Sequence, residues 1–144
     1  MKKLILPCHE IEGHLVPPAD KSVSHRAAIL NSLAKGEAMI DNFSEGADCK
    51  STLNCLKAMG VAAEKLDPIN GEERLRIVSP GLANFMEPSD VLNAKNSGTT
   101  MRFLMGLLGS TSFCSVITGD KSLRTRPMKR IVDPLRLMGA QIMG

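Results

Sequence analysis

The sequence predicts an α/β (α+β) fold built from a repeated unit. Helical and strand-like patterns of apolar residues alternate at short intervals along all 144 residues. The sequence also contains an internal duplication, because LKAMGV at residues 56–61 returns as LRLMGA at residues 135–140. Arg26 and Arg102 recur at a similar offset, which gives a period of about 75 to 80 residues. The order of patterns in the first copy predicts a βαβαββ-like unit.

The first copy opens with a predicted helix. From residue 22 to residue 35, apolar side chains recur at helical spacing, which predicts a helix that buries Val23, Ala27, Leu30, Leu33 and Ala34. Ser22 or Ser24 offers the N-cap, and Gly36 offers the end of the helix. A strand is predicted next, from Ala38 to Phe43.

A second helix and a hairpin complete the first copy. The helix is expected to begin near Asp48, to end at Gly60 and to bury Leu53, Leu56 and Met59. Residues 61–66 and 74–78 have strand patterns, and the Asn70-Gly71 pair between them suits a tight turn. These two segments are therefore predicted to form a β-hairpin.

The second copy repeats this order but stops early. A helix is predicted from Gly98 to Leu108, a strand over 113–118, a helix from about Pro127 to Gly139 and the start of a strand over 141–143. Because the copy reaches Gly144 before its hairpin can form, we expect the chain to be a fragment of a longer protein. We expect a strand segment over 1–17 and a partial domain over 18–144, with repeat units at about 18–80 and 90–144.

Three segments carry side chains suited to binding anions: DKSVSHR at 20–26, NSGTTMR at 96–102 and TGDKSLRTRPMKR at 118–130. The first two place hydroxyl groups, a basic residue and free backbone N–H groups where a helix begins, and a helix N-terminus stabilises anions. Lys21, Ser22 and Arg26 could converge on one anion, although a surface lysine and an arginine lying over the sheet would fit the same pattern. We interpret the segments as a site for a phosphorylated or carboxylated small molecule.

Together and in this order, the three segments resemble the EPSP synthase (3-phosphoshikimate 1-carboxyvinyltransferase) family from about Glu10 to Gly144. The resemblance implies an inside-out α/β barrel of two domains with three units each, of which this chain would hold about two of six, the second incomplete. Residues 1–17 would pack with the other domain. The implied reaction transfers the carboxyvinyl group of phosphoenolpyruvate to the 5-hydroxyl of shikimate-3-phosphate and releases phosphate, on the shikimate pathway to chorismate and aromatic amino acids.

The resemblance also implies roles for individual residues. Lys21 matches a catalytic lysine that touches both substrates, and Ser22 and Arg26 match residues that hold shikimate-3-phosphate. Gly98 and Arg126 match residues on the phosphoenolpyruvate side. Four further residues are expected to support the site: Asn96, Thr99, Arg102, as a loop ion-pair partner or a direct contact, and Arg124, as an accessory charge. The family's acid and base lie downstream of Gly144, so we expect this chain to bind substrates without turning them over.

Two positions depart from the family pattern. Lys95 stands where the family usually has the first glycine of its phosphate loop. If that position needs a positive φ, Lys95 introduces about 1 kcal/mol of strain or a shifted loop. Ala19 replaces a common glycine before Asp20, and Asp20 itself is similar to the glyphosate-tolerant bacterial branch.

Composition argues against other classes of protein. The net charge of +3 is small for a nucleic-acid-binding protein, and no aromatic residue lies within the basic cluster of Lys121, Arg124, Arg126, Lys129, Arg130 and Arg136. No apolar run approaches the roughly 18 residues that would span a membrane, so a cytoplasmic protein is expected. Neither a metal nor an organic cofactor is implied. We expect a monomeric full-length enzyme, whereas a fragment could self-associate through unpaired strands.

The cysteines and histidines give weaker signals. Cys8, Cys49, Cys55 and Cys114 lack metal or redox spacing and are interpreted as buried or partly buried thiols. His25 is expected to face the anion site, and His9 and His14 to be surface residues. Two alternatives stay open: a fragment similar to UDP-N-acetylglucosamine 1-carboxyvinyltransferase, although residues 121–125 lack that family's loop cysteine, and a non-enzymatic phosphate-binding module.

Overall fold

A computed structural model describes residues 3–4, 6–7, 10, 12–13, 15, 17–69 and 71–144. In chain order its elements are α1 (Lys21–Leu33), β1 (Lys35–Asp41), α2 (Ala47–Ala58), β2 (Ala62–Ile69), β3 (Glu72–Pro80), the short 3-10 helix η1 (Leu82–Asn84), β4 (Leu92–Asn93), α3 (Gly98–Leu108), β5 (Ile117–Thr118), α4 (Lys121–Arg124) and α5 (Lys129–Leu137).

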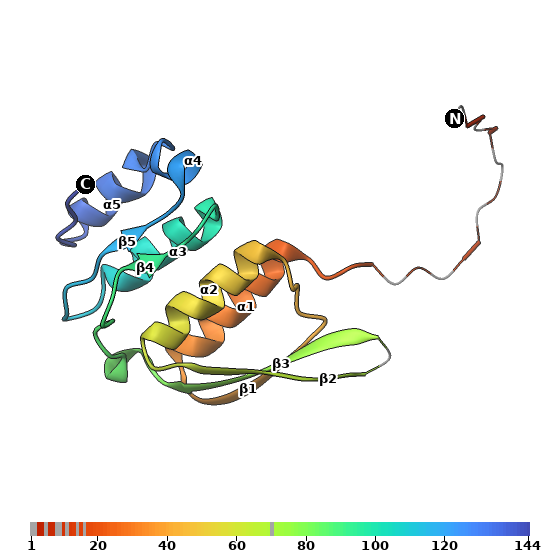
Figure 1. Ribbon diagram of the computed structural model, residues 1–144, viewed down its shortest axis with the longest axis horizontal. Coiled ribbons are helices and arrows are strands. Elements are labelled where there is room, and N and C mark those ends of the chain that lie inside the picture. The colour runs from red at the N-terminus through yellow and green to blue at the C-terminus, as the bar shows by residue number, and fades with distance from the viewer. Residues whose placement is uncertain are drawn as a thin grey trace.

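The larger sheet is antiparallel, with strand order β1-β3-β2, and α1 and α2 lie side by side over one of its faces (Figure 1). Residues alternate between the two faces of a strand, so β3 buries Leu75, Ile77 and Ser79 and turns Arg74 and Arg76 outward. The predicted hairpin is confirmed, because Ile69 pairs with Glu72 and leaves a two-residue connection.

The outer face of this sheet is held by ion pairs between neighbouring strands. Arg76 donates to Glu37 over 2.7 Å, and Arg74 donates to Asp41 over 2.9 Å. On the opposite, helix-facing side of the sheet, Lys65 contacts Glu73 and also Glu45, which lies outside the sheet. Such exposed pairs contribute little individually, on the order of 0.2–1 kcal/mol each.

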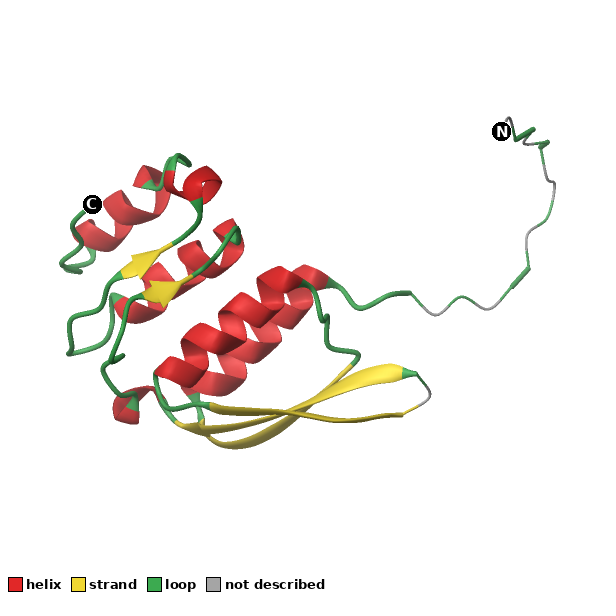
Figure 2. Cartoon of the chain, in the orientation of Figure 1, coloured by secondary structure: helices red, strands yellow, loops and turns green. Residues whose placement is uncertain are grey.

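The second part of the chain is a crossover with little sheet. β4 and β5 pair in parallel over two residues each and are joined through α3 (Figure 2). The main hydrophobic core runs through α1, α2, β3 and α3, with Ala28, Leu56, Met59, Ile77 and Leu104 fully buried. A smaller cluster of Ala94, Met101 and Leu123 lies under α4. By contrast, no residue of α5 is buried.

The buried face of α1 differs from the prediction. Asp20, not Ser22 or Ser24, caps the helix, and the buried residues are Ser24, His25, Ala28, Ile29 and Ser32. Val23, Leu30 and Leu33 are exposed, so the apolar pattern misidentified the core face. The two buried serines are satisfied locally, because Ser24 Oγ donates to the Asp20 carbonyl and Ser32 Oγ donates to the Ala28 carbonyl.

The helix ends agree better with the sequence. At the end of α2, Gly60 has φ of +94° and Val61 N–H donates to the Leu56 carbonyl. At the end of α5, Gly139 has φ of +99° and Ala140 N–H donates to the Leu135 carbonyl. Both are Schellman motifs, in which glycine adopts the left-handed conformation that closes the helix.

In the second copy one strand prediction is too long and another is wrong. Only Ile117–Thr118 of the segment 113–118 is a strand, and residues 141–143 form none. A strand needs a hydrogen-bonding neighbour, and β4, the partner of β5, is itself only two residues long. The helix predicted from Pro127 begins two residues later, at Lys129.

Cys49 and Cys55 are buried as expected, whereas Cys114 is exposed, because its segment leaves the strand. Cys8, His9 and His14 lie outside the described residues. The described part of 3–17 has no regular secondary structure, so the N-terminal strand stays a prediction. None of the described helices is long and apolar enough to cross a membrane.

Candidate anion site at three helix N-termini

The first turns of α1, α2 and α3 lie next to one another. Lys21, which begins α1, places its Nζ 2.7 Å from Asp48 Oδ2 in the first turn of α2. Thr100, in the first turn of α3, donates from Oγ1 to the Asp48 carbonyl over 3.2 Å. Each helix N-terminus carries about half a positive charge, so three of them favour a negative group here.

Asp48 is a site residue that sequence reasoning missed. Its hydrogen bond and charge raise the pKa of Lys21 above its ordinary value, which keeps the ammonium protonated. An acidic residue in the first turn of a helix usually serves the helix dipole, so the sequence held no cue that Asp48 pairs with a lysine 27 residues away.

The other two residues expected to hold shikimate-3-phosphate lie on the same helix. Ser22 and Arg26 are both exposed on α1, one turn apart. Within the described residues, neither side chain has a hydrogen bond or an ion pair to another side chain. Their donors therefore face solvent near Lys21.

The second segment forms a loop that is tied to the third. Asn96 donates from Nδ2 to Asp120 Oδ2 over 2.7 Å and accepts from Arg126 Nη2 over 3.1 Å. Asp120 N–H donates to the Lys95 carbonyl over 2.7 Å. The hydrogen bond from Asn96, followed by the N–H of Leu123, lowers the pKa of Asp120 below its ordinary value. The carboxylate thus stays charged and holds both segments together.

Two guanidinium groups converge above Gly98. A Cβ at this position would lie 2.8 Å from Arg102 Nη1 and 3.0 Å from Arg126 Nη1. Any larger residue would displace these side chains. Arg102 makes no ion pair with the residues that the structure describes, so no such partner accounts for its position over the glycine.

Lys95 has φ of +53°, so the position where the family has glycine does adopt the left-handed conformation. The strain expected from the sequence is therefore present at this residue. Of the remaining supporting residues, Thr99 is half-buried in the first turn of α3 and Arg124 is exposed at the end of α4.

His25 does not face the anion site as expected. It is fully buried between helices, and its Nδ1 lies 2.8 Å from Thr52 Oγ1. Burial lowers the pKa of His25 below its ordinary value, against the opposing effect of Asp48. The imidazole is therefore a neutral element of the helix interface.

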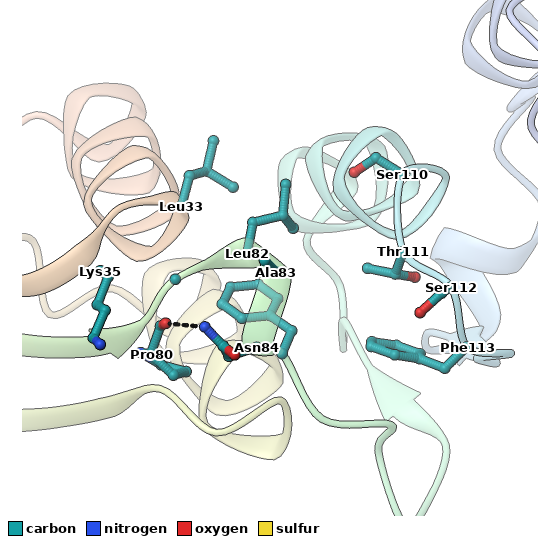
Figure 3. Close-up of a pocket in the computed structure, with 12 residues that line it drawn as sticks. Leu33, Lys35, Pro80, Leu82, Ala83, Asn84, Ser110, Thr111, Ser112 and Phe113 are labelled. Atoms are coloured by element: carbon teal, nitrogen blue, oxygen red, sulfur yellow. Dashed lines mark hydrogen bonds between the residues drawn. The ribbon is translucent and has the colours of Figure 1, made fainter.

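A cavity lies elsewhere in the molecule. It has a volume of about 620 Å³ and is lined by Leu33, Lys35, residues 80–85 and Ser110 to Phe113 (Figure 3). Leu33 and Lys35 lie at the C-terminal end of α1, and residues 110–113 follow that of α3, where the helix dipole is negative. None of the predicted site residues lines this cavity, and its electrostatics do not suit an anion. Among the described residues, no group of His, Cys, Asp or Glu could hold a metal ion.

The fold is mixed α/β, and one lysine and two arginines lie around three helix starts, an arrangement of charge that suits an anion. Residues 6–144 match the family model for EPSP synthase (3-phosphoshikimate 1-carboxyvinyltransferase), and the chain belongs to this family.

Individual relatives agree. The chain is 50% identical over 141 residues to the 3-phosphoshikimate 1-carboxyvinyltransferase of Petrotoga mobilis, covering 98% of this chain and 32% of that protein. For the protein of the same name from Herpetosiphon aurantiacus, identity is 48% over 100% of this chain and 32% of the relative. The solved EPSP synthase from Acinetobacter baumannii superposes with a TM-score of 0.81 at 45% identity, covering 92% of this chain and 30% of that one. The chain thus spans about a third of the length of its curated relatives.

Proposed function

We propose that this chain forms the substrate-binding part of an enzyme that transfers the carboxyvinyl group of phosphoenolpyruvate to the 5-hydroxyl of shikimate-3-phosphate and releases phosphate. The observation that carries the proposal is the convergence of three helix N-termini with Lys21, Arg102 and Arg126. Both proposed substrates are small polyanions, and this arrangement supplies both the charges and the backbone donors that such ligands need.

The geometry supports two sides of the site, each of which binds one substrate. On α1, Lys21, Ser22 and Arg26 are the proposed contacts for shikimate-3-phosphate. On the loop before α3, Gly98 and Arg126 are the proposed contacts for phosphoenolpyruvate, supported by Asn96, Thr99, Arg102 and Arg124. Lys21 would serve both ligands, because Asp48 holds its ammonium at the junction of the two sides.

In this proposal the chain binds both substrates but does not catalyse their conversion. A carboxyvinyl transfer needs proton donors and acceptors enclosed away from bulk water, usually by closure of a second wall over the substrates. The proposed enzyme is a cytoplasmic monomer with six repeat units, two of which, the second of them incomplete, lie in this chain. The residues here would neutralise and orient the two anions.

The proposal is tested by titrating shikimate-3-phosphate and phosphoenolpyruvate separately into the chain while following backbone amide signals. Shikimate-3-phosphate should shift the signals of Ser22 and Arg26, and Lys21→Met should weaken that response at least tenfold, because the bound anion loses a cation. Unchanged signals at millimolar ligand would count against the assignment.

The phosphoenolpyruvate side has a matched pair of glycines on one helix. Gly98→Ala should displace the guanidinium groups and weaken phosphoenolpyruvate binding about tenfold. Gly106→Ala is the control, because its Cβ would meet nothing within 4 Å. The control should bind normally and gain about 0.5–1 kcal/mol of stability from its helix propensity. Equal affinities of the two variants for phosphoenolpyruvate would contradict the assignment of Gly98 to the phosphoenolpyruvate side.

A further inference from the structure

A chain of buried hydroxyl groups crosses the interior behind the anion site. From α1, His25 Nδ1 lies 2.8 Å from Thr52 Oγ1 on α2. From there, Thr52 Oγ1 lies 2.7 Å from Thr100 Oγ1 on α3, and Thr100 Oγ1 lies 2.7 Å from Ser97 Oγ. All four residues have an exposed fraction of 0%. Three helices are thus joined by polar contacts in a region that apolar packing could have filled.

The available protons determine which group donates and which accepts in each of these buried hydrogen bonds. The Thr100 hydroxyl has two acceptors within reach, Ser97 Oγ and the Asp48 carbonyl, so its proton points toward them. Its oxygen can then accept from the Thr52 hydroxyl, and the Thr52 oxygen can accept from His25 Nδ1–H. The other ring nitrogen of His25, Nε2, is buried without a partner. A bare nitrogen lone pair is tolerated there more easily than an unpaired N–H.

Thr100 is the point where the two sides of the anion site share a contact. Toward the loop, its N–H and hydroxyl both donate to Ser97, the N-cap residue that directly precedes Gly98. Toward α2, the same hydroxyl group lies 3.2 Å from the carbonyl oxygen of Asp48, which shares the one proton of this hydroxyl group with Ser97, and the carboxylate of Asp48 holds Lys21. A displacement of Thr100 would therefore move Gly98 and Lys21 relative to one another.

We propose that Thr52 and Thr100 are positioning residues, whose buried hydroxyl groups fix the spacing between Lys21 and the Gly98 loop. For the identity of the ligands, the inference rests on the proposed function. Neither hydroxyl is accessible to a ligand, so each acts through other residues. The side chains are stiff because both are β-branched, and both buried hydroxyl groups are hydrogen-bonded, which favours one arrangement of the helices.

The test compares variants that remove one hydroxyl at nearly constant volume. In the 144-residue chain, Thr100→Val and Thr52→Val should each weaken phosphoenolpyruvate binding, by about tenfold for Thr100 and less for Thr52, which is one contact further from the loop. Thr100→Ser and Thr52→Ser keep the hydroxyl and should stay within about threefold of the wild-type affinity. Thr111→Val is the control, because the Thr111 hydroxyl donates to the Leu108 carbonyl at the far end of α3.

Two readouts do not depend on a substrate. Nitrogen NMR of the imidazole should show the proton of His25 on Nδ1. Amide hydrogen exchange at Gly98 and Thr100 should be faster in both valine variants and unchanged in Thr111→Val. Because Thr52 does not touch the loop, faster exchange at Gly98 in Thr52→Val would show transmission through Thr100. If Thr100→Val does not fold, Thr52→Val and its serine partner still decide the question.

The inference would be overturned if both valine variants kept wild-type affinity and wild-type exchange at Gly98. Protonation of His25 on Nε2 would also overturn the proposed order of donors and acceptors in the buried hydrogen bonds. If the wild-type chain bound no phosphoenolpyruvate while the exchange results came out as expected, the proposed substrate would be wrong but the positioning role would stand.

Discussion

Residues 18–80 and 90–144 show similar sequence patterns but differ in how much they bury. The first region has a three-stranded sheet under two helices, and both helices contribute to the core. The second region has only the short β4–β5 pair, and no residue of its α5 is fully buried. The difference is clearest at two matched leucines, because Leu56 is fully buried whereas Leu135 is half-buried.

The comparison separates what local sequence determines from what packing determines. Both helices that contain these leucines end in the same Schellman motif, at Gly60 and Gly139. A helix end is closed by groups within six residues, so it forms with or without a neighbouring sheet. Burial needs a partner surface, and α2 has β2 beside it while β5 is too short to serve α5 in the same way.

The largest expected effect comes from truncating the matched leucines. Leu56→Ala should lower the free energy of unfolding by about 2–5 kcal/mol, because it leaves a cavity in the main core. Leu135→Ala should lower it by less than about 1 kcal/mol, because the side chain is already partly in water. Urea denaturation of the two variants measures both values.

Leu104→Ala serves as a check within the second region. Leu104 is fully buried in the same core as Leu56, so its truncation should also cost about 2–5 kcal/mol. Similar losses for Leu56→Ala and Leu135→Ala would mean that the two regions do not differ in packing as described.

Much of the fold could be predicted because its signals are local. The limits of α3, Gly98–Leu108, were predicted correctly, since Ser97 caps one end and Gly109 follows the other. The buried face of α1 was not, because Ser24, His25 and Ser32 find hydrogen-bond partners that no periodicity reveals. The missing strand over 141–143 shows the same limit, since strand pairing depends on a neighbour and not on propensity.

The candidate site likewise combines features that could be predicted from the sequence with features that could not. The positive φ at Lys95 could be expected from a loop pattern, and the closeness of Arg126 to Gly98 followed from the family resemblance. The pairing of Lys21 with Asp48, and the buried contacts of Thr52 with Thr100, join residues 27 and 48 positions apart. Contacts of that kind are set by how the helices pack, so one sequence alone gives no signal for them.

The second prediction concerns pH and the neutral His25 of the first region. Counting from Arg26 and Arg102, the position matched to His25 in the second region is the apolar Met101, so His25→Met makes the two regions alike. Burial lowers the pKa of folded His25, with Asp48 opposing and Lys21 adding to this effect, whereas the unfolded value is 6.5. Below that pH the unfolded chain takes up the proton first, so stability falls as the pH falls.

We expect the free energy of unfolding of the wild-type chain to fall between pH 6.5 and 5.5 through this residue, and that of His25→Met to change little over the same interval. Thermal unfolding across pH 5 to 8 gives the slopes. The carboxylates of Glu37 and Glu45, whose pKa values are lowered by Arg76 and Lys65, act only at more acidic pH. Identical slopes for the two proteins would rule out His25 as the source.

The smallest expected effect uses the two non-glycine residues with positive φ among those described, Asn42 in the first region and Lys95 in the second, both at +53°. Asparagine tolerates the left-handed conformation, whereas a lysine there is strained by about 1 kcal/mol. Glycine relieves that strain but makes the unfolded chain more flexible, which offsets about half of the gain. Lys95→Gly should therefore raise the free energy of unfolding by about 0.5 kcal/mol, and Asn42→Gly should leave it unchanged or lower it slightly. Paired urea titrations of the two variants measure the difference, and an equal gain at both positions would show that Lys95 is no more strained than Asn42.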